Sequence, residues 1–573
     1  EFINKIAEIK STIPIPEWIG SNSWVLAPQK TESGKVFFAN DTHIGYAQPS
    51  VWYEAHIEFP GFKLYGNHIA GIPFALLGHN QNTAWGMTMF ENDDTDLFRE
   101  KLNPENENQV WFKDHWEDLK IENKKIKVKG GQIVDFQLKI SRHGPIMNQT
   151  LSKLDTTEAP IAVWWTYTQV KSDLFKALYS LDYSKNIDDA RKAVSLIHAP
   201  GLNIMYGDKD GNIAWWAAAK LVKRAEHINP KLILDGSSGN DEYLGFYDFT
   251  DNPQSENPPC GYVYSANNQP DTIAGILYPG YYAPENRAKR INQLLNNDNK
   301  WNIDKMKVMI TDAVSSVHPD VVKTLFSRIN KENIEKKSGN YQKAYELLEK
   351  WDGNHLKTDI APTIYYKLLY NVLHNTFADE IGENDFNYLV SSHLMEKTYP
   401  SLFKNENSPW WDNIETENKE ISAEIIENAF ISSIDELEKQ LGENINEWKW
   451  EKVHTIEHVH PIGRKAPFDK IFNVGPFNVK GGNQVINNLD FHLDGDGTYE
   501  ASYGPAIRIL LDFSDIENSI SVLPTGESGR FMSKHYDDQT EMYNEGIFRK
   551  QMMNKEEILS KKEGTLVLKP VSQ

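Results

Sequence analysis

The chain has 573 residues, of which 40% are hydrophobic and 12% aromatic, so it is long enough and apolar enough to bury a large core. Its 60 basic and 81 acidic residues give a formal net charge of −21, which argues against nucleic acid or an anionic membrane as a partner. The single cysteine excludes an intrachain disulfide, a cysteine-based zinc site and an iron–sulfur cluster.

The first twenty residues end at a glycine that directly precedes a serine, Gly20-Ser21. Residues 1–5 lack the apolar middle region of a signal peptide, and no run in the chain reaches the about 18 apolar residues of a membrane span. Gly20-Ser21-Asn22-Ser23-Trp24 then places a serine behind a glycine at the start of a strand-like run. If the Gly20–Ser21 bond is cut, Ser21 carries a hydroxyl and an α-amine of pKa about 7.7 to 8.0 that accepts its proton. On these residues alone, a polar turn before a strand is the simpler interpretation.

Residues 22–147 are dense in β-branched and aromatic runs broken by turn residues, which predicts that the first half is mainly sheet. The segment 124–129 alternates lysine with Ile and Val, as an edge strand with one solvated face does. Asp210-Gly211-Asn212 predicts a hairpin, because glycine tolerates the positive φ of a tight primed turn. Cys260 is predicted to be a small buried hydrophobe.

Between about 300 and 450 the apolar spacing becomes helical, and after about 465 strands return at 508–513 and 520–523. One helical stripe is predicted to be core: Ile425, Ile426, Ala429, Phe430, Ile434 and Leu437. Because no repeat or low-complexity linker separates these parts, we interpret the helical stretch as an insertion into one α/β body.

A series of ordered motifs accompanies the serine segment. They are Ala39-Asn40-Asp41-x-His43, Ala84-Trp85-Gly86-x-Thr88, Asp93-Asp94-x-Asp96, His143-Gly144-Pro145-Ile146, Asn267-Asn268-x-Pro270, Arg287-x-x-Arg290, His460-Pro461, Gly475-Pro476-Phe477, Gly481-Gly482 and Ser533-x-His535-Tyr536-Asp537-Asp538-Gln539. In this order and spacing the set resembles the β subunit of the penicillin acylase family, the N-terminal nucleophile amidohydrolases that include penicillin G acylases and acyl-homoserine lactone acylases. The resemblance runs from about Ser21 to the C-terminus and implies a four-layer αββα sandwich with a largely helical insertion.

The resemblance also implies roles for individual residues. Ser21 is the nucleophile, and the main-chain N–H of Met89 and the amide of Asn267 bind the oxyanion. His43 has an accessory role, hydrogen-bonding the serine and handling protons, and Arg287 positions the asparagine or the substrate. The acyl pocket is expected to be apolar, with four candidates that favour an arylacetyl or fatty acyl group: Ile44, Leu76, Leu77 and Thr88.

Maturation and partners follow from the same resemblance. Residues 1–20 are expected to be the end of a spacer, removed by intramolecular cleavage between Gly20 and Ser21, and residues 21–573 the β subunit of a heterodimer with an α subunit from the same precursor. Asp93, Asp96 and the main-chain oxygen of Thr95 are expected to help bind one structural calcium ion, and no organic cofactor is expected. The expected location is the periplasm. Penicillin and acyl-homoserine lactones both remain open as substrates.

The sequence also offers two alternatives from other functional classes. The run His454-Thr455-Ile456-Glu457-His458 fits the H-x-x-E-H pattern of a zinc peptidase, but two such histidines converge on zinc only in a helix, and the neighbouring residues favour a strand. In an extended chain the two histidines stand about 13 Å apart. A β-rich periplasmic glycan-binding or scaffold protein would account for the 16 tryptophans without catalysis.

Overall fold

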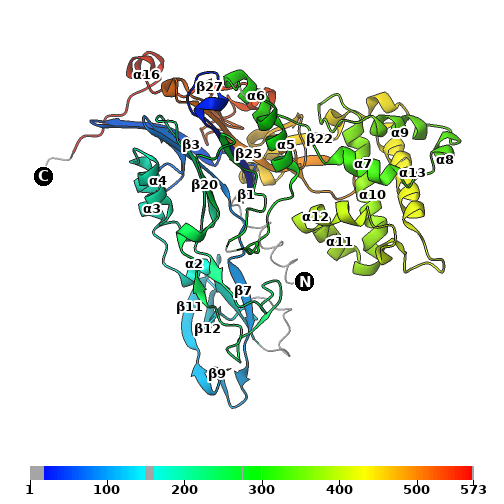
Figure 1. The fold of residues 1–573 in the computed structure, drawn as a ribbon, viewed down its shortest axis with the longest axis horizontal. Helices are drawn as coiled ribbons and strands as arrows, with labels where there is room; N and C mark the ends of the chain where they lie inside the picture. Colours follow the sequence, from blue (N-terminus) through cyan, green and yellow to red (C-terminus); the bar gives the residue numbers. More distant parts are fainter. Residues whose placement is uncertain (1–17, 149–159, 274, 299, 571–573) are drawn as a thin grey trace.

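The computed structural model describes residues 18–148, 160–273, 275–298 and 300–570 (Figure 1). Residues 1–17 of the expected spacer therefore lie outside the described residues. Two stacked sheets form the centre of the molecule. The larger sheet contains β1 (Trp18–Leu26), β2 (Phe37–Gly45), β21 (Tyr262–Ser265), β22 (His454–His458), β23 (Val474–Asn478), β24 (Asp490–Phe491), β25 (Tyr499–Asp512), β26 (Ile520–Val522) and β27 (Arg549–Lys550).

The second sheet runs in the order β20-β16-β15-β6-β5-β4-β3, and all its neighbouring strands are antiparallel. Its strands are β3 (Trp52–Phe59), β4 (Phe62–Ile69), β5 (Leu77–Asn80), β6 (Thr83–Met89), β15 (Leu202–Asp208), β16 (Ile213–Ala218) and β20 (Gln254–Glu256). The predicted hairpin is confirmed, because β15 and β16 pair antiparallel around Gly211, whose φ is 104°.

Helices cover the outer face of each sheet, which gives the four layers that the resemblance implies. The helices α3 (Leu174–Asp182) and α4 (Ile187–Val194) pack on the second sheet, and α5 (Asn286–Asn297) and α6 (Ile303–Ile310) pack on the larger one. Strand β1 shows how the sequence builds the layers: Val25 belongs to the core between the sheets, whereas Trp24 and Leu26 belong to the core under α5 and α6. Successive side chains of a strand point to opposite faces, so an apolar run is buried on both.

A mainly helical region forms a separate lobe beside the sheets and has its own core (Figure 1). Its helices are α7 (His318–Phe326), α8 (Lys331–Glu335), α9 (Tyr341–Glu349), α10 (Ala361–Ile381), α11 (Glu383–Leu389), α12 (His393–Leu402) and α13 (Ser422–Leu441). The predicted stripe from Ile425 to Leu437 lies on α13 and is buried. The helix ends at Gly442, whose φ of 89° suits a residue without a side chain.

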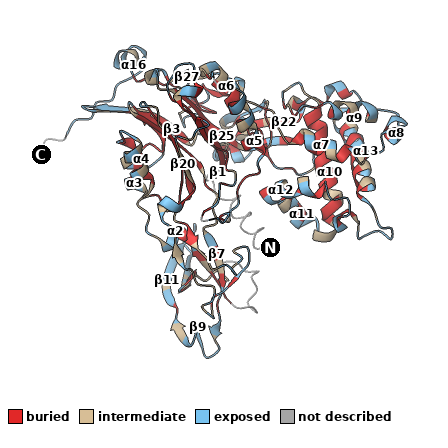
Figure 2. Ribbon diagram, in the orientation of Figure 1, coloured by how far each residue is buried: buried red, intermediate tan, exposed pale blue. Residues whose placement is uncertain are grey.

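A projecting arm of small sheets carries much of the exposed surface in Figure 2. It contains β7 (Thr95–Arg99), β8 (Leu102–Asn103), β9 (Asn106–Phe112), β10 (His115–Asp118), β11 (Lys120–Lys127), β12 (Ile133–Ser141), β13 (Gly144–Pro145), β14 (Ile161–Trp165), β17 (Val222–Lys223), β18 (Leu234–Asp235) and β19 (Gly245–Phe246). The lysine-rich segment is an edge strand, as predicted. Both of its faces are largely exposed, rather than one, because the arm has no layer packed on either side of β11.

Four short helices complete the described strands and α-helices: α2 (Thr166–Gln169), α14 (Asp469–Phe472), α15 (Thr540–Glu545) and α16 (Lys555–Lys561). The prediction that Cys260 is buried is wrong, since the residue is exposed. It lies in the loop between β20 and β21, where Pro258, Pro259 and Gly261 turn the chain outside the sheets. Among the described helices, none combines the length and the hydropathy required to cross a bilayer.

Candidate active site

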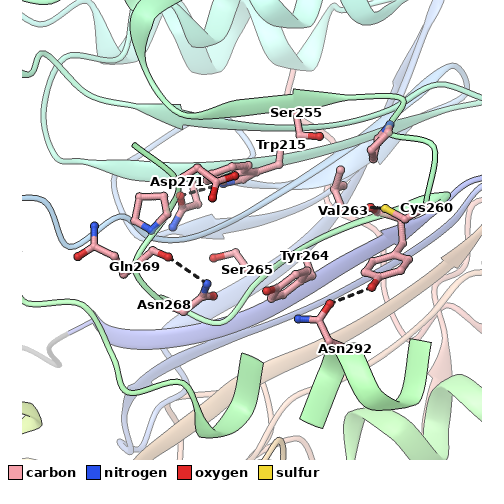
Figure 3. Close-up of a pocket in the computed structure, with 14 residues that line it drawn as sticks. Trp215, Ser255, Cys260, Val263, Tyr264, Ser265, Asn268, Gln269, Asp271 and Asn292 are labelled. Carbon is pink, nitrogen blue, oxygen red and sulfur yellow. Dashed lines mark hydrogen bonds between the residues drawn. The ribbon is translucent and has the colours of Figure 1, made fainter. Parts of the chain in front are cut away.

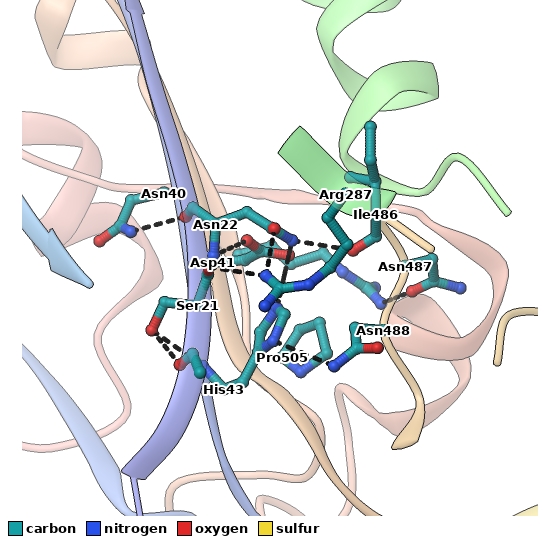
Figure 4. A network of polar contacts seen from close by, with 12 residues as sticks. Ser21, Asn22, Asn40, Asp41, His43, Arg287, Ile486, Asn487, Asn488 and Pro505 are labelled. Atoms are coloured by element: carbon teal, nitrogen blue, oxygen red, sulfur yellow. Dashed lines mark hydrogen bonds and ion pairs between the residues drawn. The ribbon is translucent and has the colours of Figure 1, made fainter. Parts of the chain in front are cut away.

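Ser21 lies near the start of β1, between β2 and the edge strand β21, and is fully buried. Its hydroxyl donates a hydrogen bond to the carbonyl oxygen of Gly20 and accepts one from the main-chain N–H of His43 at 3.3 Å. Figure 4 shows this contact from close by. The hydroxyl therefore lies against the peptide group that precedes it.

Asn267 faces Ser21 from the end of β21. Its side-chain Oδ1 accepts a hydrogen bond from the main-chain nitrogen of Ser21 at 2.7 Å, and its Nδ2 donates to the carbonyl of Met89 at 2.9 Å. The residue is fully buried with a φ of 62°. A left-handed conformation in a residue other than glycine costs about 1 to 3 kcal/mol and persists only where the surroundings fix it.

Arg287, on α5, joins these groups from the outer layer. The guanidinium donates to the carbonyl of Ser21 at 2.9 Å, to Asn22 Oδ1 at 2.7 Å and to Asn267 Oδ1 at 3.2 Å. Because Asn267 Oδ1 faces two donors, the orientation of the amide is set by the network, with its nitrogen toward Met89. Burial lowers the pKa of Arg287, but a guanidinium stays charged in proteins.

The His43 ring lies beside the side chains of Asn22 and Asp41. Its Nε2 lies 3.2 Å from Asn22 Nδ2 and 3.5 Å from Asp41 Oδ2. Burial, together with the positive charges of Arg287 and Arg508, holds the pKa of His43 well below its ordinary value. The imidazole is therefore neutral near pH 7, and the main-chain N–H of His43 donates to Ser21 Oγ.

Several polar residues of the site had no predicted role. Asp41 accepts hydrogen bonds from the main chain of Asn22 at 3.1 Å, and burial raises the pKa of its carboxyl although Arg508 and Arg287 oppose this. Asn40 donates to the carbonyl of Asn22 at 2.9 Å and accepts from the N–H of Met87 at 3.3 Å, so it ties β1 to β6. The signal for Asn22, Asn40 and Asp41 was present, because they stand inside the motifs of Ser21 and His43.

Glycine 86 belongs to the same arrangement. A Cβ atom at this position would stand 2.6 Å from Asn40 Oδ1, so only glycine lets Asn40 approach β6. Gly20 differs, since a Cβ there would lie 3.4 Å or more from Asn267, His43 and Arg287. The packing therefore requires a glycine at position 86, next to Asn40, but not at position 20, before Ser21.

The four predicted acyl-pocket residues lie between the sheets. Ile44, Leu76 and Leu77 are buried in the core that the two sheets share, and the hydroxyl of Thr88 lies 2.7 Å from that of Ser265. A cavity of about 320 Å³ opens close to Asn267 and is lined by Trp215, Tyr264, Asn268 and others, not by these four (Figure 3). Asn203 forms part of its wall and donates to the Met89 carbonyl at 2.9 Å.

The acidic turn lies apart from this network, in the arm. Asp96 Oδ2 accepts from Arg224 Nη2 at 2.8 Å and from the Tyr243 hydroxyl at 2.6 Å, and Asp93 stands 3.4 Å from the same guanidinium. Burial raises the pKa of Asp93 to about 6. Asp96 Oδ1 is buried without a hydrogen-bond partner in the part of the chain that the structure describes. Arg224 thus faces the carboxylates of Asp93 and Asp96, and Asp96 Oδ1 remains without a hydrogen-bond partner among the described residues.

The H-x-x-E-H pattern lies on strand β22, as its residues predict. The Nδ1–H of His454 donates a hydrogen bond to the Tyr499 carbonyl at 2.6 Å, and the ring stacks on Trp450. Burial lowers the pKa of both His454 and His458 to about 3. A strand cannot bring these histidines together on one ion, and within the described ranges no three His, Cys, Asp or Glu side chains are arranged to bind a metal.

Known proteins resemble this chain over most of its length. The family model described as penicillin amidase matches residues 4–560. The acyl-homoserine lactone acylase QuiP of Pseudomonas aeruginosa is 27% identical, over 92% of this chain and 66% of that protein. The penicillin acylase 2 proenzyme of Pseudomonas sp. strain SE83 is 24% identical, over 91% and 65%. The chain therefore spans slightly less than two thirds of these curated relatives.

The fold is shared with a solved structure. The thermostable penicillin G acylase from Alcaligenes faecalis superposes with a TM-score of 0.73 at 19% identity, covering 96% of this chain and all of that one. At this identity the match bears on the fold. It confirms the layered α/β architecture that the motifs imply.

Proposed function

This chain belongs to the penicillin amidase family, and on that premise we propose that it hydrolyses the linear amide bond of N-acyl compounds through an acyl-enzyme on Ser21. The observation that carries the proposal is the convergence of Ser21, Asn267 and Arg287, with the Met89 main chain, from four separate elements onto one buried point. Burial in such a network strengthens each polar contact, because water does not compete for it.

Activation is proposed to begin with cleavage of the Gly20–Ser21 bond. In the continuous chain the Ser21 nitrogen is an amide that donates to Asn267, so it has no basic lone pair. Ser21 Oγ attacks the Gly20 carbonyl carbon, and the C–N bond breaks as the nitrogen takes a proton and becomes an amine. Water then hydrolyses the Gly20 ester, which leaves a carboxylate on Gly20 and restores the hydroxyl beside a free amine.

In turnover, the amine accepts the hydroxyl proton while Ser21 Oγ attacks the acyl carbon of the substrate. We propose that the Met89 N–H and the second N–H of the Asn267 amide bind the oxygen that becomes negative, since only one of the two Asn267 N–H groups is used on Met89. The ammonium then protonates the leaving nitrogen. Water attacks the Ser21 ester and releases the acid, and Arg287 holds Asn267 and the Ser21 carbonyl throughout.

A first prediction concerns pH. The amine must be neutral to act as a base, so kcat/KM should fall as the pH drops through its pKa, which is about 7.7 to 8.0 before burial and Arg287 lower it. His43 is already neutral in this range. His43→Gln should therefore keep this acidic limb, with kcat within about 10-fold of wild type. Profiles of kcat/KM from pH 5 to 9 test this, and loss of the limb in the variant would assign the titration to His43 instead.

We propose that the acidic turn binds calcium as a structural ion. The carboxylates of Asp93 and Asp96 and the main-chain oxygen of Thr95 would hold it, and the unpaired Asp96 Oδ1 fits a hard cation. At 100 times its Kd, calcium should stabilise chelator-treated protein by about 2.7 kcal/mol. Asp96→Asn should remove the rise in Tm, whereas Asp94→Asn, in the same turn, should keep it. If calcium changes the melting temperature of neither the wild type nor the two variants, this site is excluded.

The partner and the location are also part of the proposal: an α subunit from the same precursor completes the site, and the pair acts in the periplasm. One relative is described as a proenzyme, which supports a precursor that is processed. A non-catalytic glycan-binding or scaffold role is the alternative, and it predicts that Ser21→Ala leaves binding unchanged.

The substrate class can be tested with one release assay. Phenylacetyl amides, phenoxyacetyl amides and acyl-homoserine lactones of several lengths should be compared, with Ser21→Ala as the blank. We expect hydrolysis of at least one apolar acyl series, because the residues that the resemblance assigns to the acyl pocket include Ile44, Leu76 and Leu77, which are buried among apolar side chains. The similarity to QuiP favours including the lactones as the second candidate class. Failure of the activated heterodimer on every series would refute the proposed activity.

A further inference from the structure

A short loop between β23 and β24 contacts four separate polar groups of the site. We call Gln484–Asn488 the clamp loop. Its partners are Arg287 Nε, 3.4 Å from Gln484 Oε1; Asn22 Nδ2, 2.9 Å from the Ile486 carbonyl; Arg508 Nη2, 2.8 Å from Asn487 Oδ1; and His43 Nδ1, 3.5 Å from Asn488 Nδ2. Figure 4 shows Ile486, Asn487 and Asn488 beside Arg287 and His43.

Gln484 is the strained residue of this loop. It is 3% exposed and has a φ of 57°, a left-handed conformation that is unfavourable for residues other than glycine. Its main-chain N–H donates to Asn488 Oδ1 at 2.8 Å, so the loop is closed on itself. Strain of this kind collects at sites where the surrounding contacts hold a side chain in one direction.

The Gln484 side chain links the charged guanidinium of Arg287 to an acidic side chain. Among the described residues, the hydrogen-bond partners of the buried Arg287 are all neutral: Ser21, Asn22, Asn267 and Gln484. The carboxyls of Asp41, Glu91 and Asp490 favour the charge of Arg287 from a distance, but none of them holds the guanidinium by a hydrogen bond among the described residues. Gln484 Nε2 in turn donates to both carboxylate oxygens of Glu396, at 3.2 and 3.4 Å. The glutamine therefore connects the guanidinium to a carboxylate by hydrogen bonds at both ends of its amide.

Glu396 lies on α12, in the helical lobe, and its side chain is mostly buried. Burial and the neighbouring Asp490 raise the pKa of this carboxyl, whereas the hydrogen bond from Gln484 and the charges of Arg287 and Lys397 lower it. Gln484 and Glu396 also line a cavity of about 20 Å³, which has room for one water molecule. The contact thus joins Glu396 of the helical lobe to Ser21 through two buried side chains, Gln484 and Arg287.

We propose that Gln484 is a positioning residue that fixes the Arg287 guanidinium against Ser21 and Asn267, with Glu396 as its anchor in the helical lobe. The inference rests on the proposed function, because it assigns Arg287 to the catalytic network. It gives the helical lobe a part in turnover. A guanidinium released on its Nε side can rotate, and both the Ser21 carbonyl and Asn267 Oδ1 then lose a fixed donor.

The test uses the activated heterodimer and compares four variants with wild type. Gln484→Met keeps the length of the side chain and removes both hydrogen bonds. Glu396→Gln combined with Gln484→Glu exchanges the amide and the carboxylate, so total charge and both contacts are kept. Glu396→Gln alone replaces the carboxyl group with an amide. Asn483→Ala is the matched control, because Asn483 lies in the adjoining turn and bonds the main chain of Phe491 instead of Arg287.

We expect Gln484→Met to lower kcat about 10-fold or more, with KM within about 3-fold, since a small misplacement of a positioned group acts on the transition state. The exchange variant should recover at least half of the lost kcat on a logarithmic scale, and Asn483→Ala should lower Tm rather than kcat. Glu396→Gln alone should fall between wild type and Gln484→Met.

Three results would overturn the inference: unchanged kcat in Gln484→Met, an exchange variant no better than Gln484→Met, or an equal loss of kcat in Asn483→Ala. If Gln484→Met does not fold, the exchange variant still decides the matter, because it preserves the contacts. Absence of turnover in wild type would instead count against the proposed function, so the two failures are distinguishable.

Discussion

Ser21→Ala is expected to abolish turnover and to leave the 573-residue chain joined between Gly20 and Ser21. Alanine removes the oxygen that attacks both the Gly20 carbonyl and the substrate. Loss of a nucleophile in a hydrolase lowers kcat by about 10⁴-fold or more. Intact-mass measurement after incubation with the partner subunit, together with the amide-release assay, checks both consequences in one preparation.

Ser23 offers a matched control on the same strand. It is buried like Ser21, lies two residues along and so on the same face of β1, and its hydroxyl donates to the Ala39 carbonyl at 2.7 Å. Ser23→Ala should cost about 1 kcal/mol of stability through one lost hydrogen bond and should keep cleavage and turnover. If Ser21→Ala is processed like Ser23→Ala, the nucleophile lies elsewhere.

Asn267→Ala is expected to lower kcat by about 10² to 10³-fold, which corresponds to about 2.7 to 4 kcal/mol of transition-state stabilisation. The substitution removes the proposed oxyanion donor together with the acceptor of the Ser21 nitrogen. Because the φ of Asn267 is 62°, alanine also strains the main chain. Asn267→Gly separates the two effects, since glycine accepts this φ and lacks the amide. Both variants should lose kcat alike, and alanine should have the lower Tm.

Asn268→Ala is the control for the asparagine pair. This side chain is half-buried, donates to the Gln269 carbonyl at 3.4 Å and faces the cavity of Figure 3 rather than Ser21. Its kcat should remain within about 3-fold of wild type, as expected of a substitution that leaves the reacting atoms in place. A glycine variant at position 267 with wild-type kcat would remove Asn267 from the oxyanion site.

Local patterns predicted the local elements. The Asp210-Gly211-Asn212 turn, the stripe on α13 and the return of strands after residue 465 all depend on neighbours within a few residues, and the structure contains them. Cys260 and the lysine-rich strand were judged from the same kind of pattern. For these two the predicted burial was wrong, because the exposure of a side chain depends on whether a second layer covers it.

The layers and the site depend on contacts between distant segments. Strand β1 pairs with β2 and with β21, about 240 residues along the chain, and no periodicity indicates that pairing. The order of the motifs implied it by resemblance, and the structure brings Ser21, Asn267 and Arg287 together. Gln484 and Glu396 carried no such signal, since a single glutamine and a helical glutamate are ordinary residues until the fold places them beside a buried arginine.

The account depends most directly on a free amine at Ser21 in the working enzyme. N-terminal sequencing of turnover-competent protein measures this, with the Ser21→Ala chain as the uncleaved reference. We predict that the catalytic polypeptide begins with Ser21, and that blocking its amine abolishes turnover. Full activity in protein whose Gly20–Ser21 bond is intact would contradict the account.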